Sequence, residues 1–119
     1  MISKQKSFNF LDTLGESKSG ESVIYKNNTD NKVILILKSI SGSRYLTNPP
    51  YNHITLTHIY KILDSNNILK EFLFSFCSDY NTILDKKIVL EKGESVTVQR
   101  LNYGNTNDIV SVVYDILSE

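Results

Sequence analysis

The segment Lys87 to Gln99, KIVLEKGESVTVQ, constrains the fold of this chain more than any other stretch. Two short apolar runs flank the polar turn 91–94, in which Gly93 can adopt the positive φ that such turns often need. Val96 and Val98 alternate with polar residues, which is the period of a half-buried strand. The segment therefore predicts two strands joined by a tight turn.

Five further apolar runs of strand length surround this hairpin, and polar turns or loops separate them. They span residues 21–26, 32–40, 54–63, 68–77 and 109–117. Seven strands without a convincing helix predict an all-β fold. We expect an antiparallel β-sandwich of about seven to eight strands, Ig-like or jelly-roll-like.

The run KVILILKSI, residues 32–40, is apolar on both faces of the predicted strand. Val33, Leu35 and Leu37 share one face, and Ile34 and Ile36 share the other. This pattern predicts either a central strand or a strand that a partner covers.

Two other predicted strands carry aromatic or ionisable residues in alternation. In residues 68–77, the alternation places Phe72, Phe74 and Phe76 on one face. In residues 54–63, His58 lies among the inward-facing apolar positions, so a buried histidine is expected there rather than a metal ligand.

Consecutive antiparallel strands place alternate connections at the same end of a sandwich. The short turns 27–31, 64–67 and 91–94 then share one end, and the long loops 41–53, 78–86 and 101–108 share the other. Four tyrosines fall in or beside the long loops: Tyr45, Tyr51, Tyr80 and Tyr103. Because loops on a rigid scaffold often carry function and tyrosine is favoured at interfaces, we predict that these tyrosines contact a partner.

The first twenty residues are predicted to form an N-terminal arm, followed by a sandwich domain over residues 21–119. GESKSG, residues 15–20, is typical of a flexible joint. Phe8, Phe10 and Leu11 need burial, which suggests an arm that docks on a neighbouring subunit. A frayed terminus is the alternative.

Composition excludes several functional classes. The 119 residues carry 13 basic and 13 acidic side chains, a balance that argues against nucleic-acid binding. The single Cys77 excludes an internal disulfide and a multi-cysteine zinc site. A signal peptide and an apolar run of transmembrane length are both lacking, so we expect a soluble protein that is made in a cytoplasm and has no membrane partner.

Catalytic and metal-binding patterns are weak. His53 and His58 are five residues apart and would face opposite sides of one strand. Asp79, Asp85 and Asp108 could meet at the long-loop end around calcium, but their spacing matches no known calcium loop. The nucleophile elbow and the glycine-rich phosphate loop are lacking too. We therefore expect no enzyme, no cofactor and no metal.

Four segments resemble small virion structural proteins of tailed bacteriophages: VIYKNNTDNKVILI, KILDSNNILKEF, TILDKKIVLEKGESVTVQ and IVSVVYDIL. In that group a turn of the type in Leu90 to Val96 leads into the penultimate strand, and a valine-rich strand ends in a motif like Tyr114-Asp115-Ile116. The resemblance implies a sandwich repeated symmetrically in a head, neck or tail assembly, with no enzyme activity and no cofactor.

The resulting expectation is a non-enzymatic structural subunit located in the virion and made in the host bacterial cytoplasm. It would act by self-association and by docking on other virion proteins. The predicted contacts are the arm residues Phe8, Phe10 and Leu11 and the tyrosines Tyr45, Tyr51, Tyr80 and Tyr103. A glycan-binding module, whose tyrosines stack on host-surface sugars, is the alternative.

Overall fold

A computed structural model describes residues 2–10, 21–46, 57–77, 81–100 and 106–118. This part of the chain forms eight strands and no helix. The strands are β1 (Ile2–Phe10), β2 (Glu21–Lys26), β3 (Val33–Leu46), β4 (Thr57–Leu63), β5 (Leu69–Cys77), β6 (Asn81–Leu90), β7 (Ser95–Arg100) and β8 (Thr106–Ser118). The predicted all-β class is thus confirmed. Within the same ranges, no helix is long and apolar enough to cross a membrane.

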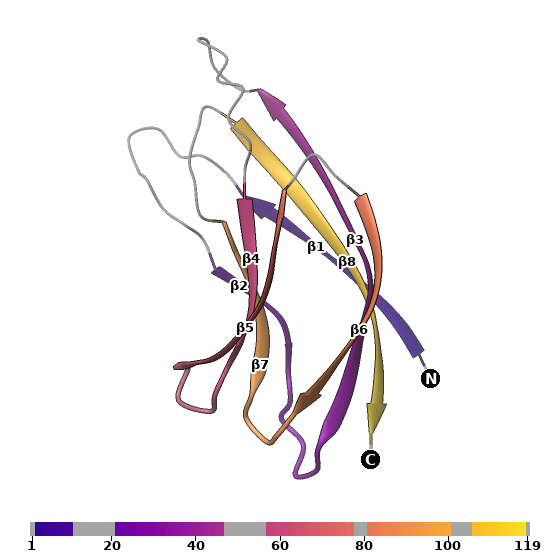
Figure 1. The fold of residues 1–119 in the computed structure, drawn as a ribbon, viewed down its shortest axis with the longest axis vertical. Coiled ribbons are helices and arrows are strands. Elements are labelled where there is room, and N and C mark those ends of the chain that lie inside the picture. Colours follow the sequence, from indigo (N-terminus) through magenta and orange to yellow (C-terminus); the bar gives the residue numbers. More distant parts are fainter. Residues whose placement is uncertain (1, 11–20, 47–56, 78–80, 101–105, 119) are drawn as a thin grey trace.

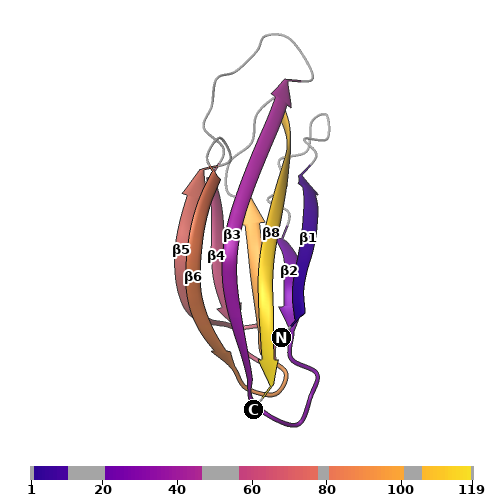
Figure 2. The same cartoon turned by 90° about the vertical axis from the view of Figure 1, so that its right-hand side faces the viewer.

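The strands form two four-stranded antiparallel sheets that lie against each other as a β-sandwich (Figure 1). Sheet A has the order β1-β8-β3-β6, and sheet B has the order β2-β7-β4-β5. Figure 2 shows the edge strands β5 and β6 along one side of the sandwich and β1 and β2 along the other. The central strands β3 and β8 of sheet A pair over almost their whole lengths.

Alternating residues of both sheets meet in the core between them. The buried apolar side chains include Leu35, Leu37, Val112 and Tyr114 from sheet A, and Ile24, Tyr60, Ile62, Val96 and Val98 from sheet B. Tyr60 stacks on Phe74, with the ring centroids 4.8 Å apart. His58 is fully buried on the same face as Tyr60, so its predicted inward orientation is confirmed. The core therefore follows the period-2 pattern of the sequence.

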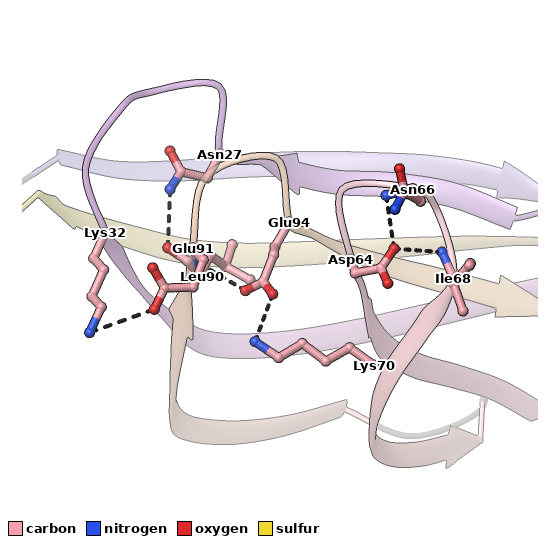
Figure 3. Close-up of polar contacts among 9 residues, drawn as sticks. All are labelled: Asn27, Lys32, Asp64, Asn66, Ile68, Lys70, Leu90, Glu91 and Glu94. Atoms are coloured by element: carbon pink, nitrogen blue, oxygen red, sulfur yellow. Dashed lines mark hydrogen bonds and ion pairs between the residues drawn. The ribbon is translucent and has the colours of Figure 1, made fainter.

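The three short turns share one end of the sandwich, as predicted (Figure 3). Backbone hydrogen bonds join two of them. Asn27 N donates to Glu94 O over 2.9 Å, and Gly93 N donates to Asn27 O over 2.7 Å. Gly93 has a φ of 81°, and a Cβ added there would lie 2.8 Å from Ser65 Cβ in the third turn. The absence of a side chain at Gly93 thus permits both the turn and the close approach.

Side chains reinforce this end. The amide of the fully buried Asn27 donates to Asn31 O over 2.9 Å and to Leu90 O over 3.0 Å, and its oxygen accepts from Thr29 N over 3.0 Å. Glu94 accepts from Glu91 N over 2.8 Å and from Lys70 Nζ over 2.6 Å (Figure 3). These contacts stabilise the turns themselves, so we assign this end to the framework of the fold.

The N-terminal residues give the main difference from the predicted architecture. The prediction places residues 1–20 in an arm outside the sandwich, whereas Ile2–Phe10 pair with β8 as an edge strand of sheet A. Lys4 and Lys6 stand opposite Tyr114 and Val112, on the core side of the sheet, yet both lysines are exposed. Inward-facing charges at an edge oppose unwanted strand pairing. Polar alternation in this segment therefore marks an edge strand rather than an arm.

Three strands are longer than their predicted ranges. The run predicted to end at Ile40 continues to Leu46, because residues 41–46 pair with β8. β6 begins at Asn81, inside the predicted loop 78–86, and β8 begins at Thr106, inside the predicted loop 101–108. The three extensions are rich in polar residues and therefore have the composition of loops. Their backbone groups nevertheless hydrogen-bond to neighbouring strands of sheet A.

Candidate interaction surface

Strand β3 presents apolar side chains on both of its faces. Val33, Leu35 and Leu37 are buried in the core, whereas Ile34 and Ile36 point to the outer face of sheet A and are half-buried. β3 is central in the sheet, since β8 and β6 pair with it on either side. The central position of β3 explains why both of its backbone edges are paired. It does not explain why the side of β3 that faces away from the core is apolar, because a two-layer sandwich needs to bury only one face of each sheet.

Neighbouring strands extend the apolar outer face of β3. Ile34 stands between Leu117 of β8 and Val89 of β6. Ser39 stands between Val113 of β8 and Ile83 of β6. We call the resulting set the aliphatic face of sheet A, and it consists of Ile34, Ile36, Ile83, Val89, Val113 and Leu117. Because directly opposed residues share a face, these six side chains lie on the same side of one sheet.

The most exposed large apolar side chain of the described residues lies at the edge of this face. Ile83 in β6 is 85% exposed, and Val89 in the same strand is 44% exposed. Ile83 borders a shallow open pocket that is also lined by Ser39, Ile40, Ser41 and Thr82. The pocket combines hydroxyl groups with aliphatic walls, and it opens to solvent at the edge of sheet A.

A β-bulge lies beside the pocket. Leu37 pairs with Lys86 and Ser39 pairs with Ile83, so two residues of β6 face the single residue Lys38 of β3. One of the two, Asp85, has a φ of 86°, which is uncommon for a residue with a side chain. A bulge of this kind twists an edge strand and redirects its side chains.

The bulge also carries an ion pair. Lys38 Nζ lies 2.5 Å from Asp85 Oδ1, and both side chains are substantially exposed. The hydrogen bond with Asp85 raises the pKa of Lys38 above its usual value, and the negative charges of Asp85 and Asp115 add to this effect. Because the ion pair is exposed, water and salt screen it, and it adds little to the stability of the fold. We infer that its role is to orient the bulge.

A buried carboxylate lies on the same side of sheet A. Asp115 of β8 stands between Ile36 and Ser3, and only 4% of it is exposed. Ser3 Oγ donates to Asp115 Oδ1 over 2.5 Å. Four residues along the same strands, the hydroxyl groups of Ser7 and Ser111 are 2.8 Å apart. The outer face thus changes from aliphatic near β3 to polar where β1 joins β8.

Sheet B presents a different outer surface. Lys61 of β4 donates to Gln99 of β7 over 2.7 Å and forms an ion pair with Glu21 of β2 at 2.7 Å. Exposed apolar side chains lie on either side of Lys61: Val23 on β2, and Ile68, Leu69 and Phe72 at or beside the start of β5. A row of cross-strand polar contacts therefore divides the apolar side chains of sheet B.

The predicted stripe of three phenylalanines in β5 is wrong. Tyr60 pairs with Phe74, but Lys61 pairs with Phe72, so one extra residue in β5 breaks the alternation between the two rings. Phe74 packs against the core, whereas Phe72 is 55% exposed on the outer face. A bulge of one residue reverses the side to which every later side chain points.

Most of the predicted contact residues lie outside the described residues, namely Leu11, Tyr51, Tyr80 and Tyr103. Phe10 and Tyr45 lie in β1 and β3, but the structure describes only their backbones. Phe8 is half-buried and packs against the core of its own chain, and its predicted contact with a neighbour stays a prediction.

Ionisable residues do not gather into a metal site among the described residues, where no group of three or more histidine, cysteine, aspartate or glutamate side chains converges. Asp85 lies in β6 and Asp108 in β8, and Asp79 and His53 lie outside the described ranges. His58 pairs with Arg100 of β7, and both side chains are buried.

The sequence indicated part of this surface and missed the rest. Ile34 and Ile36 were identifiable from their alternation, whereas Ile83 and Asp85 fell in a predicted loop. The run Thr82-Ile83-Leu84, which Asp85 and Lys86 separate from the predicted strand, was the available signal for a longer β6.

Comparison with known proteins adds no assignment, because no protein-family model and no curated protein matches this chain.

Proposed function

We propose that this protein is a non-enzymatic structural subunit of a tailed phage particle, which self-associates and docks on another head, neck or tail protein. Assignment to a virion rests on the resemblance of the four segments described above. Self-association rests on one structural observation, which is the aliphatic face of sheet A. Tyr45, Tyr51, Tyr80 and Tyr103 remain proposed contacts with the docking partner.

The aliphatic face supports association because a two-layer sandwich needs to bury only the inner face of each sheet. Sheet A carries six aliphatic side chains on its other face, and two of them, Ile83 and Val89, are well exposed. Large apolar patches on a soluble surface typically mark sites of protein contact. A net charge of zero adds little repulsion between copies.

The free energy needed for association requires that several of these side chains be buried together. Complete burial of one exposed aliphatic side chain contributes about 1.5–3 kcal/mol. Association has to overcome about 4–15 kcal/mol of lost translational and rotational freedom. One isoleucine cannot offset this loss. The six side chains lie in two groups, around Ile34 and beside Ser39, and Ile36 between these groups pairs with Lys87 and Asp115. Association therefore requires that both groups be covered together.

The test compares two surfaces of the same protein. Ile83→Lys combined with Val89→Lys places two charges on the aliphatic face, and both sites are exposed enough for the fold to tolerate lysine. Val23→Lys is the matched control, because Val23 is 48% exposed but lies in sheet B. Size-exclusion chromatography with light scattering, at the protein concentration of an assembled particle, gives the mass of each variant.

We expect the wild type and Val23→Lys to be oligomers and the double variant to be a monomer with an unchanged circular-dichroism spectrum. A wild type that stays monomeric at that concentration would contradict the proposal. So would a double variant that keeps the wild-type mass.

A further inference from the structure

β1 is joined to the rest of the sandwich through β8. β8 is its only neighbour in sheet A, and the register runs without interruption from Ile2 opposite Ile116 to Phe10 opposite Asp108. Residues 3–7 have exposed side chains, and Phe8 is the described β1 side chain that packs against the core. Among its described side chains, the strand is therefore held by a backbone ladder, by the packing of Phe8 and by two side-chain hydrogen bonds, Ser3–Asp115 and Ser7–Ser111.

β8 needs a strand in this position. Its other edge is occupied by β3, and its core-facing residues Val110, Val112 and Tyr114 are buried. Without β1, nine residues of β8 would leave one backbone edge open beside the core. Every contact that fills this edge comes from residues 2–10, so the β1 of a second copy can make the same contacts.

We infer that β1 is exchanged between copies, so that β8 of one molecule pairs with Ile2–Phe10 of another. This inference deepens the proposed self-association and rests on it. Because the exchanged and unexchanged ladders contain the same hydrogen bonds, the balance between them depends on the connection from β1 to β2 and on protein concentration.

The other edge strands are less suited to exchange. The pairings of β2 with β7, of β6 with β3 and of β5 with β4 all contain register shifts, whereas the pairing of β1 with β8 contains none. A strand that another molecule can supply needs a regular ladder, because each bulge removes hydrogen bonds and twists the edge. β1 also precedes all the other described strands in the sequence, so its release leaves their order intact.

Chain length permits the exchange. Ten residues, 11–20, connect β1 to β2. Ten extended residues reach about 33–36 Å. This reach exceeds the two shorter dimensions of the molecule, 29 and 18 Å, so β1 can cross to a neighbour that lies against the same side. A connection of this length holds its own strand at an effective concentration of about 1 mM, and exchange becomes competitive as the local protein concentration approaches that value.

The exchange can be tested with a disulfide between β1 and β8. Ser7→Cys with Ser111→Cys places thiols at two directly opposed positions, in a background with Cys77→Ser. The control is Ser41→Cys with Ser111→Cys in the same background, because Ser41 of β3 is also directly opposite Ser111. The full chains are oxidised at a series of concentrations up to about 1 mM and separated on non-reducing gels.

We expect the β1–β8 pair to yield covalent dimers or longer ladders whose share rises with concentration, and the β3–β8 pair to yield only internally linked monomers. If both cysteine pairs yield only internally linked monomers at all concentrations, the exchange is overturned. It is also overturned if both pairs form disulfides between chains to the same extent, because such crosslinks would be adventitious. A wild type that is oligomeric by light scattering while β1 links only within its own chain would overturn the exchange and leave the proposed self-association standing. Conversely, linking through β1 together with a double variant on the aliphatic face that keeps the wild-type mass would support the exchange and contradict that face as the interface.

Discussion

Lys38 and Asp85 face each other across the bulge in sheet A, with Lys38 Nζ 2.5 Å from Asp85 Oδ1 and the Asp85 backbone at a φ of 86°. The ion pair is exposed, but the backbone conformation beneath it is one that residues with a Cβ rarely adopt. The bulge thus holds local strain at the edge of the aliphatic face, directly beside Ile83.

Two substitutions at Asp85 distinguish the effect of backbone strain on stability from the effect of the ion pair. Asp85→Ala and Asp85→Gly both remove the ion pair with Lys38, but only glycine relieves the positive φ. We expect the glycine variant to be more stable than the alanine variant by about 1 kcal/mol. Urea denaturation measures the difference, and equal unfolding free energies would show that the bulge is not strained.

Loss of the Asn27 side chain should strongly destabilise the short-turn end. Asn27→Ala removes bonds to three residues and leaves Leu90 O without that donor in a buried position. We expect a loss of about 3 kcal/mol in the free energy of unfolding. Asn28→Ala is the control, because Asn28 is exposed, and it should change stability by less than about 0.5 kcal/mol. Similar losses in both variants would refute the assigned role of Asn27.

The contact between Gly93 and Ser65 can be tested with a double-mutant cycle. Gly93→Ala should destabilise by about 1–3 kcal/mol because of the positive φ alone. The new Cβ would also lie 2.8 Å from Ser65 Cβ, which adds a steric cost. In a Ser65→Gly background this steric part disappears, so Gly93→Ala should cost less there than in the wild type. Thermal unfolding of the four proteins gives the coupling, and perfect additivity would exclude a steric contact between the turns.

Tyr114 should make the fold sensitive to alkaline pH. Burial raises the pKa of its phenol above the usual value of 10.0, and nearby Tyr25 adds to this effect. A pKa raised in the folded state gives stability that is fully present below the unfolded pKa and is lost as pH rises through the folded pKa. We expect wild-type stability to fall relative to Tyr114→Phe above pH 10.0.

The measurement is the free energy of unfolding of both proteins across that pH range, with tyrosinate absorbance recorded in parallel. The difference between the two proteins should be constant below pH 10.0. A difference that stays constant above this pH as well would contradict the assignment to Tyr114.

The sequence predicted the local elements well where alternation was clear. β2 has the predicted bounds, Glu21–Lys26, and the hairpin of β6 and β7 turns at Gly93 as expected. The apolar outer face of β3 was also apparent, because Ile34 and Ile36 interrupt what would otherwise be a polar face. These features depend on residues close together in the chain, so their pattern is visible without the fold.

Other features depended on partners far away in the chain. Residues 2–10 are polar enough to suggest a separate arm, and only pairing with residues 108–116 makes them a strand. Phe72 could not be placed outside the core from its alternation with Phe74, because the bulge between them depends on the register with β4. The same is true of Asp85, whose bulge exists only opposite Lys38.

The sequence by itself determined the all-β class, the positions of most strands and the clustering of the short turns, because side-chain period and turn residues act locally. The tertiary structure alone decided which strands lie at the edges, where bulges reverse the faces, and which apolar side chains remain exposed. These outcomes depend on register between strands up to about a hundred residues apart, as in the pairing of Ser7 with Ser111. The aliphatic face of sheet A and the backbone edge of β8 that pairs with β1 were both decided by the tertiary structure.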